Sequence, residues 1–343
     1  MLRFQSLTEW RHWRARREGP LRLLRSSPFS SPPLGVFAAD PESANAHPVV
    51  IALEHLSPTQ VTSLLRPQRV LQSRGVAVVV IAPVVSAPEL MQHGLTLRSG
   101  ISSEPSATDP IPSAVLATSH CSGAGRLAWG LATVAKVPFI VVQHGVVTPF
   151  APPLPQNAHL FAWSECDAYF WASGRRDVPT TVVGSQILWE ADQSRAETTC
   201  SNEPICFLGQ LHGPELPRHT TMQTVTELAR RGPLVYRPHP DESDLSSKLT
   251  HSMWSRQGIL ISTCAPNLGS LRGPIAGIFS TGILEAAASG IASYGYCVHP
   301  PRWISELWHR YQMAPLGESR PTEVAIEVNE PASVIADGVE ALT

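Results

Sequence analysis

Two short motifs combine histidine, arginine and small residues in ways that suit proton and phosphate chemistry. His144-Gly145 follows the apolar residues 140–142. A histidine there can take a proton from a hydroxyl near neutral pH, although a structural histidine bonded to a loop carbonyl would look the same. In the Arg-Pro-His-Pro segment 237–240, two prolines stiffen the backbone around Arg237 and His239. The N–H donors of Arg237 and His239 suit the oxygens of a diphosphate. The alternative interpretation of this segment is a rigid turn with a surface arginine.

A third motif, Ser280, Thr281 and Gly282, opens a predicted helix directly after an apolar run. A helix N-terminus offers unpaired N–H groups and the positive end of the dipole, so hydroxyls and a glycine here would make an anion site. Ordinary helix capping by Ser or Thr is the alternative. Glu285 lies one turn further on. It could accept hydrogen bonds from ribose hydroxyls, or it could be an exposed helix carboxylate.

The segment 209–213 reads Gly-Gln-Leu-His-Gly and ends a further apolar run. Gly209 and His212 would let a phosphate approach the backbone closely. No Gly-Lys-Ser/Thr, Gly-x-Gly-x-x-Gly or Gly-x-Ser-x-Gly pattern occurs. The sequence therefore disfavours a P-loop kinase, a nicotinamide enzyme and an α/β-hydrolase.

Metal chemistry is not indicated by the acidic residues. No Asp-x-Asp follows a predicted strand, so we expect neither a metal site nor a cofactor. Acids favour the first turn of a helix, and three of them are expected to begin the helix after residue 240: Asp241, Glu242 and Asp244.

These motifs need strands that end at a common edge, and the apolar pattern predicts such strands. The β-branched run 76–81 is typical of a strand buried on both faces of a parallel sheet. Other strands are expected at 49–53, 114–118, 137–142, 158–163, 180–183, 205–208, 234–237, 258–262, 275–279 and 290–296. Helices are expected at 58–73, 123–135, between 163 and 180, at 218–231, 281–289, 303–312 and near 331–342. This alternation predicts two Rossmann-like lobes, and ligands bind at the carboxyl ends of such strands.

The predicted organisation is an arginine-rich arm at 1–40, an N-terminal α/β lobe for the acceptor at 41–198 and a C-terminal α/β lobe for the donor at 199–343. The last helices could cross back to the first lobe. The polar stretch 190–203 is expected to be the linker. The active site is expected in a cleft between the loop at 144–145 and the segment 237–240.

The arm is distinctive in composition, because residues 1–25 hold seven arginines with interleaved aromatic residues. One hypothesis is an amphipathic surface helix that contacts anionic lipid. The alternatives are a helix packed on its own protein and a mobile arm.

Whole-chain composition narrows the class of protein. Hydrophobic residues make up 43% of the 343 residues and charged residues 16%, which supports sizeable cores. The net charge of −2 gives no field that would hold nucleic acid. Six cysteines without a Cys-x-x-Cys pair are typical of reduced thiols. The apolar runs are strand-sized and no secretory signal is evident, so we expect a cytoplasmic protein, with residues 1–25 able to contact the inner face of the plasma membrane.

The chain resembles the glycosyltransferase-B superfamily over about residues 45–300. The resemblance rests on the order of three motifs along the chain: His144-Gly145, segment 237–240 and Ser280-Thr281. More closely, the chain resembles bacterial capsule and teichoic-acid polymer transferases, which include CDP-glycerol glycerophosphotransferases and polysialyltransferases. The resemblance implies that His144 deprotonates an acceptor hydroxyl. It also implies that His239, Ser280 and Thr281 hold the donor's phosphates. The acidic motif that polysialyltransferases use as base has no clear match, and no acceptor-polymer domain is evident.

The resemblance implies transfer of a glycosyl or glycerophospho group from a nucleotide-linked donor to a carbohydrate or polymer acceptor in cell-surface polysaccharide synthesis. The expected mechanism is metal-independent, with His144 as the general base. A nucleotide-sugar epimerase of the same fold is an alternative. A non-catalytic nucleotide-binding protein is another.

Overall fold

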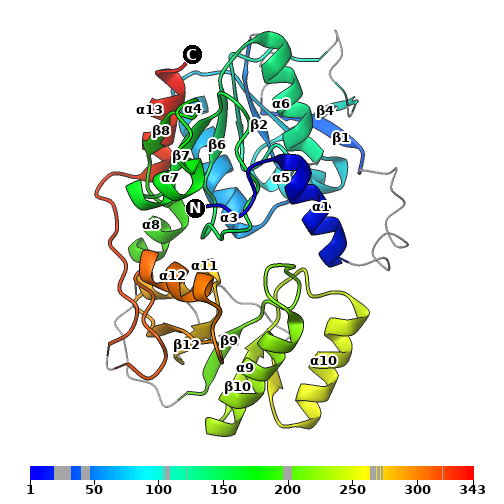
Figure 1. The fold of residues 1–343 in the computed structure, drawn as a ribbon. Coiled ribbons are helices and arrows are strands. Elements are labelled where there is room, and N and C mark those ends of the chain that lie inside the picture. The colour runs from blue at the N-terminus through cyan, green and yellow to red at the C-terminus, as the bar shows by residue number, and fades with distance from the viewer. Residues whose placement is uncertain are drawn as a thin grey trace. The chain divides into compact units, whose positions relative to one another are not determined.

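The computed structural model describes all residues except 19–31, 40–46, 103, 105–108, 122, 196–202, 263–267, 269–270, 272 and 319 (Figure 1). Residues 19–31 of the predicted arm, which include part of its arginine-rich segment, lie outside the described residues. The chain divides into two compact units. Unit 1 comprises Met1–Ile187 and Glu327–Thr343, and unit 2 comprises Leu188–Ile326. The expected cleft lies between residues of different units, 144–145 and 237–240, and it stays a prediction.

Unit 1 is built around a sheet that has eight strands within the described ranges, in the order β4-β1-β3-β2-β5-β6-β7-β8. The run from β3 to β8 is parallel throughout. Its central strands are buried along their whole length, as their unbroken apolar sequences predict. The strands are β1 Leu34–Ala38, β2 Val49–Ala52, β3 Val78–Pro83, β4 Thr96–Ile101, β5 Ala114–Ala117, β6 Phe139–Val142, β7 His159–Ala162 and β8 Thr180–Val182.

One edge of this sheet differs from the expectation of a parallel sheet. Strand β1 pairs antiparallel with both β3 and β4. Residues 34–38 were expected in the arm, and no strand was expected at residues 96–101. Most residues of β4 are exposed and show no apolar alternation, so the sequence carried no strand signal there. The sheet is therefore mostly parallel with an antiparallel edge, which is common in large α/β sheets.

The helices of unit 1 cover its sheet (Figure 1). The expected helix 58–73 is continuous but contains the π-helical turn η2, and the expected helix 123–135 is present as α6. Helix α13 packs against α4, so the C-terminal residues belong to unit 1. The helical elements are α1 Leu7–Glu18, α3 Pro58–Gln60, η2 Val61–Leu65, α4 Arg66–Ser73, η3 Val84–Ser86, α5 Ala87–Gln92, α6 Gly123–Ala135, α7 Glu165–Ala172 and α13 Pro331–Glu340.

Unit 2 holds a five-stranded sheet, within the described ranges, in the order β11-β10-β9-β12-β13. All its pairs are parallel. Its strands are β9 Ile205–Leu208, β10 Leu234–Arg237, β11 Leu260–Ile261, β12 Ile275–Gly277 and β13 Ser293–Gly295. Its helices are α9 Arg218–Arg231, α10 Leu245–Arg256, α11 Thr281–Ala288 and α12 Arg302–Arg310, and α8 Gln186–Gln193 leads into it.

Helix α8 corrects the expected linker, because residues 190–193 are helical rather than irregular. The helix is only eight residues long, which is too short for its apolar period to stand out in the sequence. Residues 196–202 of that linker lie outside the described residues. Across the described part of the chain, no helix is both long and apolar enough to cross a membrane.

Candidate functional site

The topology of unit 2 brings the three predicted donor motifs to one edge of its sheet. Strands β10, β9 and β12 are neighbours and run parallel, so their carboxyl ends meet at the same edge. Segment 237–240 follows β10, segment 209–213 follows β9, and Ser280 follows β12. This is the position at which open parallel sheets bind ligands.

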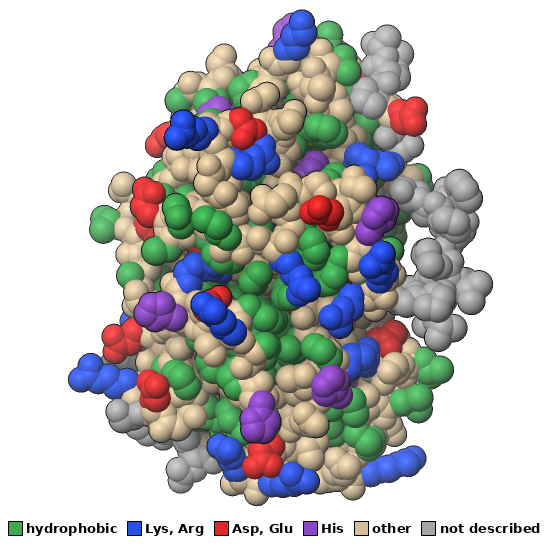
Figure 2. All heavy atoms as spheres, in the orientation of Figure 1, with side chains coloured by type: hydrophobic (Ala, Val, Ile, Leu, Met, Phe, Trp, Pro, Cys, Tyr) green, Lys and Arg blue, Asp and Glu red, His purple; other side chains and the backbone are tan. Residues whose placement is uncertain are grey.

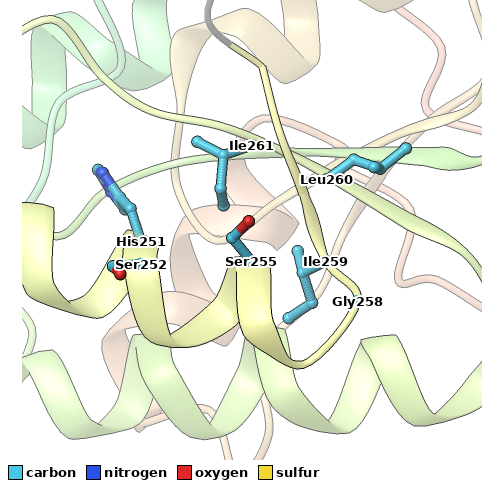
Figure 3. A pocket seen from close by; sticks show the side chains of 7 residues that line it. All are labelled: His251, Ser252, Ser255, Gly258, Ile259, Leu260 and Ile261. Carbon is cyan, nitrogen blue, oxygen red and sulfur yellow. The ribbon is translucent and has the colours of Figure 1, made fainter.

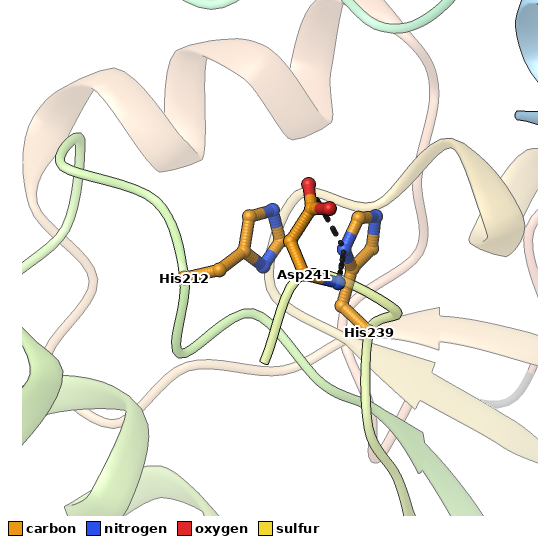
Figure 4. Close-up of side chains that lie close together, drawn as sticks. All are labelled: His212, His239 and Asp241. Atoms are coloured by element: carbon orange, nitrogen blue, oxygen red, sulfur yellow. Dashed lines mark hydrogen bonds and ion pairs between the residues drawn. The ribbon is translucent and has the colours of Figure 1, made fainter. Parts of the chain in front are cut away.

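His212 and His239 lie face to face at this edge (Figure 4). Their ring centroids are 3.8 Å apart and their planes differ by 17°. Nδ1 of His239 accepts a hydrogen bond from the backbone N–H of Asp241 at 3.2 Å. A neutral imidazole that accepts at Nδ1 carries its proton on Nε2. His239 therefore presents Nε2–H as a donor, as a phosphate oxygen requires.

The same residues form a cluster that could be considered for a metal ion. Among the described residues, ligand atoms of His212, His239 and Asp241 all lie within 4.8 Å of one another. Nδ1 of His239 already accepts the N–H of Asp241, and Oδ2 of Asp241 lies 3.6 Å from the same nitrogen. The hydrogen bond at Nδ1 leaves Nε2 of His239, rather than Nδ1, to face a ligand.

Arg237 supplies the positive charge at this edge. Its Nη1 is buried and has no hydrogen-bond partner among the described residues. An unsatisfied buried donor costs about 1–3 kcal/mol, so a ligand oxygen that accepts from Nη1 would recover that cost. Glu285 on α11 is half-buried beside Arg237. Burial raises the pKa of Glu285 to about 7, and Arg237 opposes the rise.

We expect Glu285→Gln to remove a pH dependence of stability. Because burial raises its pKa from 4.5 to about 7, the folded chain holds this proton more tightly than the unfolded chain. The stabilisation is complete below about pH 4.5 and is lost as the pH rises through 7. Raising the pH from 5 to 8 should therefore lower the free energy of unfolding of wild type, but not that of the variant, by on the order of 1 kcal/mol. Urea denaturation at both pH values measures this, and an equal difference at both would contradict it.

Helix α11 is capped by its own residue. Ser280 is the N-cap, and its Oγ accepts a hydrogen bond from Gly282 N at 3.2 Å. The capping interpretation of Ser280 is therefore confirmed, and Ile283 N donates to Ser280 O at 3.1 Å. Phe279 N donates to Oε1 of Gln210 at 3.0 Å, which ties this helix start to the loop after β9.

A buried carboxylate that sequence reasoning misplaced supports the loop after β9. Glu242 was expected in the first turn of a helix, but α10 begins at Leu245 and its N-cap is Asp244. The Glu242 side chain is fully buried. Its Oε1 accepts from Leu211 N at 2.9 Å, and its Oε2 accepts from Tyr236 Oη at 2.9 Å.

His251 and Gly209 complete this arrangement. Nε2 of His251 lies 2.9 Å from Oε2 of Glu242. A Cβ on Gly209 would lie 2.6 Å from Oε1 of Glu242 and from Tyr236 Oη. This packing explains a glycine at 209 without a ligand. Nothing local in the sequence marks Glu242 as buried, because its partners come from separate elements.

His251 also borders a pocket of about 440 Å³ between α10 and β11 (Figure 3). The pocket contains none of the predicted site residues. Its lining comprises His251, Ser252, Ser255, Gly258, Ile259, Leu260 and Ile261. It therefore stands apart from the strand ends that carry the donor motifs.

In unit 1, the His144-Gly145 loop follows β6 and is held by a buried glutamine. Gln143 is 1% exposed, and its Nε2 donates to Gly145 O and to Oδ2 of Asp167, each at 3.0 Å. Trp163 N donates to Oε1 of Gln143 at 2.9 Å. These bonds fix the backbone on both sides of His144.

His144 itself is half-buried, and its Nδ1 has no hydrogen-bond partner among the described residues. Burial, and then the charge of His55, lower the pKa of His144 to about 4. The imidazole is therefore neutral at pH 7 and can accept a proton. The low pKa also makes it a weak base.

Sequence reasoning missed a second candidate base at the same sheet edge. Strands β2, β5 and β6 are parallel neighbours, and Glu54 lies just beyond β2. Its Oε1 accepts from Gly125 N at the start of α6, at 2.8 Å. Burial raises the pKa of Glu54 to about 6, although this bond opposes the rise. The signal in the sequence was an acid directly after a buried strand.

The comparisons with known proteins bear on the fold. No family model matches it, and no curated protein matches it either. UDP-GlcNAc 2-epimerase from Methanocaldococcus jannaschii, solved with UDP-GlcNAc and UDP, is similar at 11% identity and a TM-score of 0.53, over 85% of this chain and 99% of that one.

Two glycosyltransferase structures are also similar. HepE of Anabaena, solved with UDP, is 12% identical with a TM-score of 0.48, over 86% of this chain and 89% of that one. A glycosyltransferase from Rickettsia africae is 12% identical with a TM-score of 0.49, over 87% and 88%. At such identities the likeness shows the fold alone. The chain has the α/β fold of glycosyltransferase-B proteins, with two mostly parallel sheets.

Proposed function

We propose that this chain is a metal-independent transferase. It moves a glycosyl or glycerophospho group from a nucleotide-activated donor to an acceptor hydroxyl in the synthesis of a cell-surface polysaccharide. The observation that carries the proposal is the strand-end edge of unit 2, which holds the buried Nη1 of Arg237, the oriented imidazole of His239 and the start of α11. The polysaccharide pathway rests on the order of the sequence motifs.

In this proposal unit 2 binds the donor's phosphates. Arg237 and His239 donate to the diphosphate, and the start of α11 adds the positive end of its dipole. These donors stabilise the negative charge that develops on the leaving phosphate. Glu285, whose pKa of about 7 leaves it partly ionised at neutral pH, accepts from the ribose hydroxyls of the nucleotide.

Unit 1 binds the acceptor in this proposal, and His144 acts as its general base. The acceptor hydroxyl gives its proton to the imidazole while its oxygen attacks the donor. Glycosyl transfer breaks the bond between the sugar carbon and the phosphate oxygen and releases a nucleoside diphosphate. Glycerophospho transfer breaks the bond between phosphorus and the bridging oxygen and releases a nucleoside monophosphate.

The released nucleotide tests the proposal directly. The chain is incubated with UDP-, CDP-, GDP- and dTDP-linked donors, with and without a polysaccharide extract of the source organism. Chromatography separates the nucleotide products. Acceptor-dependent release of a diphosphate or monophosphate is expected. Absence of release with every donor would contradict a transferase.

An epimerase is the second candidate, and the likeness to the M. jannaschii enzyme favours it. An epimerase changes the configuration of the sugar without any acceptor. Incubation with UDP-GlcNAc alone, followed by proton NMR of the sugar, separates the two candidates. Conversion of the sugar in the absence of an acceptor would replace the transferase proposal.

The identity of the base predicts a pH profile. A general base must be deprotonated, so the transfer rate falls as the pH drops through its pKa. That pKa is about 4 for His144 and about 6 for Glu54. If His144 is the base, kcat stays level from pH 8 to pH 5, and His144→Ala lowers it by about 10²-fold or more. A fall in kcat near pH 6, abolished by Glu54→Gln, would assign the base to Glu54.

A further inference from the structure

Helix α1 packs on its own unit, as one of the alternatives for the arm expected. Trp10 is 7% exposed, and its Nε1 donates to Phe150 O at 2.8 Å. Trp13 lies against Phe4 and stacks on Phe150, with both pairs of ring centroids 5.1 Å apart. The aromatic side of the helix is therefore used in packing on unit 1.

The other side of this segment is strongly basic. Among residues 3–17, the one acidic residue is Glu9. On the face that Figure 2 shows, Lys and Arg side chains gather over α1. The exposed arginines of this segment are Arg3, Arg11, Arg14, Arg16 and Arg17. We call these five side chains the α1 basic surface.

The α1 basic surface lies beside the carboxyl ends of the unit 1 strands. Nη2 of Arg11 donates to Cys121 O at 3.1 Å, in the loop after β5. The charge of Arg11 lowers the pKa of His120, after burial, and Arg14 acts on Cys121 in the same loop. The backbone N–H of Arg3 donates to Pro149 O, in the loop that follows His144. The segment thus borders two of the loops that line the proposed acceptor edge.

We propose that the α1 basic surface docks a negatively charged acceptor, a saccharide chain that bears carboxylate, sulfate or phosphate groups. This proposal rests on the proposed function, because it identifies the substrate class of the acceptor edge. Guanidinium groups hold such oxyanions by forked hydrogen bonds. Arginines that flank the loops after β5 and β6 would retain the chain while one of its hydroxyls reaches His144.

An anionic membrane is the other class of partner that arginines suit, and the structure disfavours it. Membrane-surface helices insert an apolar face below the headgroups. In α1 that face carries Trp10, which is buried and donates to Phe150 O, and Trp13, which packs on Phe4 and Phe150 of the same unit. The arginines of the segment remain exposed, which suits a soluble polyanion.

The test uses the full chain and a fluorescent heparin-derived octasaccharide as the anionic probe, with maltooctaose as the neutral probe. One variant is Arg11→Gln with Arg14→Gln. A second variant, Arg16→Gln with Arg17→Gln, changes exposed side chains in the last turn of the helix. The matched control, Arg256→Gln with Arg302→Gln, removes the same charge from exposed positions in unit 2. Circular dichroism checks that each variant is folded.

Wild type and the control should bind the octasaccharide equally well, and maltooctaose should not bind. Each α1 variant should bind about ten-fold more weakly, and the affinity should fall as salt is raised. An unchanged affinity in both α1 variants, or an equal loss in the control, would overturn the proposal. Binding to phosphatidylglycerol vesicles but not to the octasaccharide would assign the surface to membranes instead. Affinity for UDP, CDP, GDP and dTDP is measured in parallel, and failure there counts against the donor site alone.

Discussion

Replacing His239 with alanine should weaken nucleoside diphosphate binding by about 10- to 100-fold. A hydrogen bond to a charged group contributes about 1.5–3 kcal/mol, which is the free energy of that change in affinity. Asp241 N–H fixes the proton of neutral His239 on Nε2, so the donor is oriented before a phosphate arrives. Calorimetric titration with UDP, CDP, GDP and dTDP measures the effect on whichever nucleotide wild type binds best.

His239 is well suited to this experiment because 43% of its side chain is exposed. The substitution therefore leaves no large cavity, and a loss of binding will not reflect unfolding. His309→Ala is the matched control, since His309 is also exposed and lies in the last turn of α12. Equal affinities in wild type and both variants would remove His239 from the donor site.

Glu242→Ala should give the largest loss of stability, on the order of 3–5 kcal/mol in the free energy of unfolding. The change leaves Leu211 N and Tyr236 Oη without their buried acceptor, and it removes the partner of His251. Each buried polar group that loses its partner costs about 1–3 kcal/mol. Urea denaturation measures this loss, with the fluorescence of buried Trp254, which packs against Tyr236, as the signal.

Glu242→Ala should also weaken nucleotide binding, because the hydrogen bond that Leu211 N donates to Glu242 holds the backbone next to His212. Glu242→Gln keeps one acceptor oxygen and should recover part of both effects. The control is Glu227→Ala, which removes a carboxylate that forms a surface ion pair with Arg230. That pair should contribute about 0–1 kcal/mol. A similar loss in Glu227→Ala and Glu242→Ala would show that the buried network adds nothing.

Burial explains which elements could be predicted from the sequence. Strands such as β3, β5 and β6 are covered on both faces, so their residues are uniformly apolar and the runs 76–81, 114–118 and 137–142 marked them within a few residues. Strand β4 lies at the antiparallel edge of the sheet, and polar residues such as Arg98 and Ser99 are exposed there. The strand therefore has no apolar run that would predict it from the sequence.

The candidate site divides in the same way. Histidine and arginine after apolar runs could be located from the sequence, because strand ends of a parallel sheet share an edge whatever the details of packing. Glu242 could not, because its burial is created by Tyr236, by His251 and by the loop at Leu211, which meet only in the folded chain. The packed side of α1 likewise depends on Phe150, far away in the sequence.

The central claim is that unit 2 binds the diphosphate of a nucleotide-activated donor. The most direct measurement is a thermal-shift titration of the wild-type chain with CMP, CDP, UDP, GDP and dTDP. A ligand that binds only the folded chain raises its melting temperature by mass action. We predict a dose-dependent rise for at least one diphosphate and a smaller rise, or none, for the monophosphate CMP. A melting temperature that no diphosphate changes at millimolar concentration would contradict the claim.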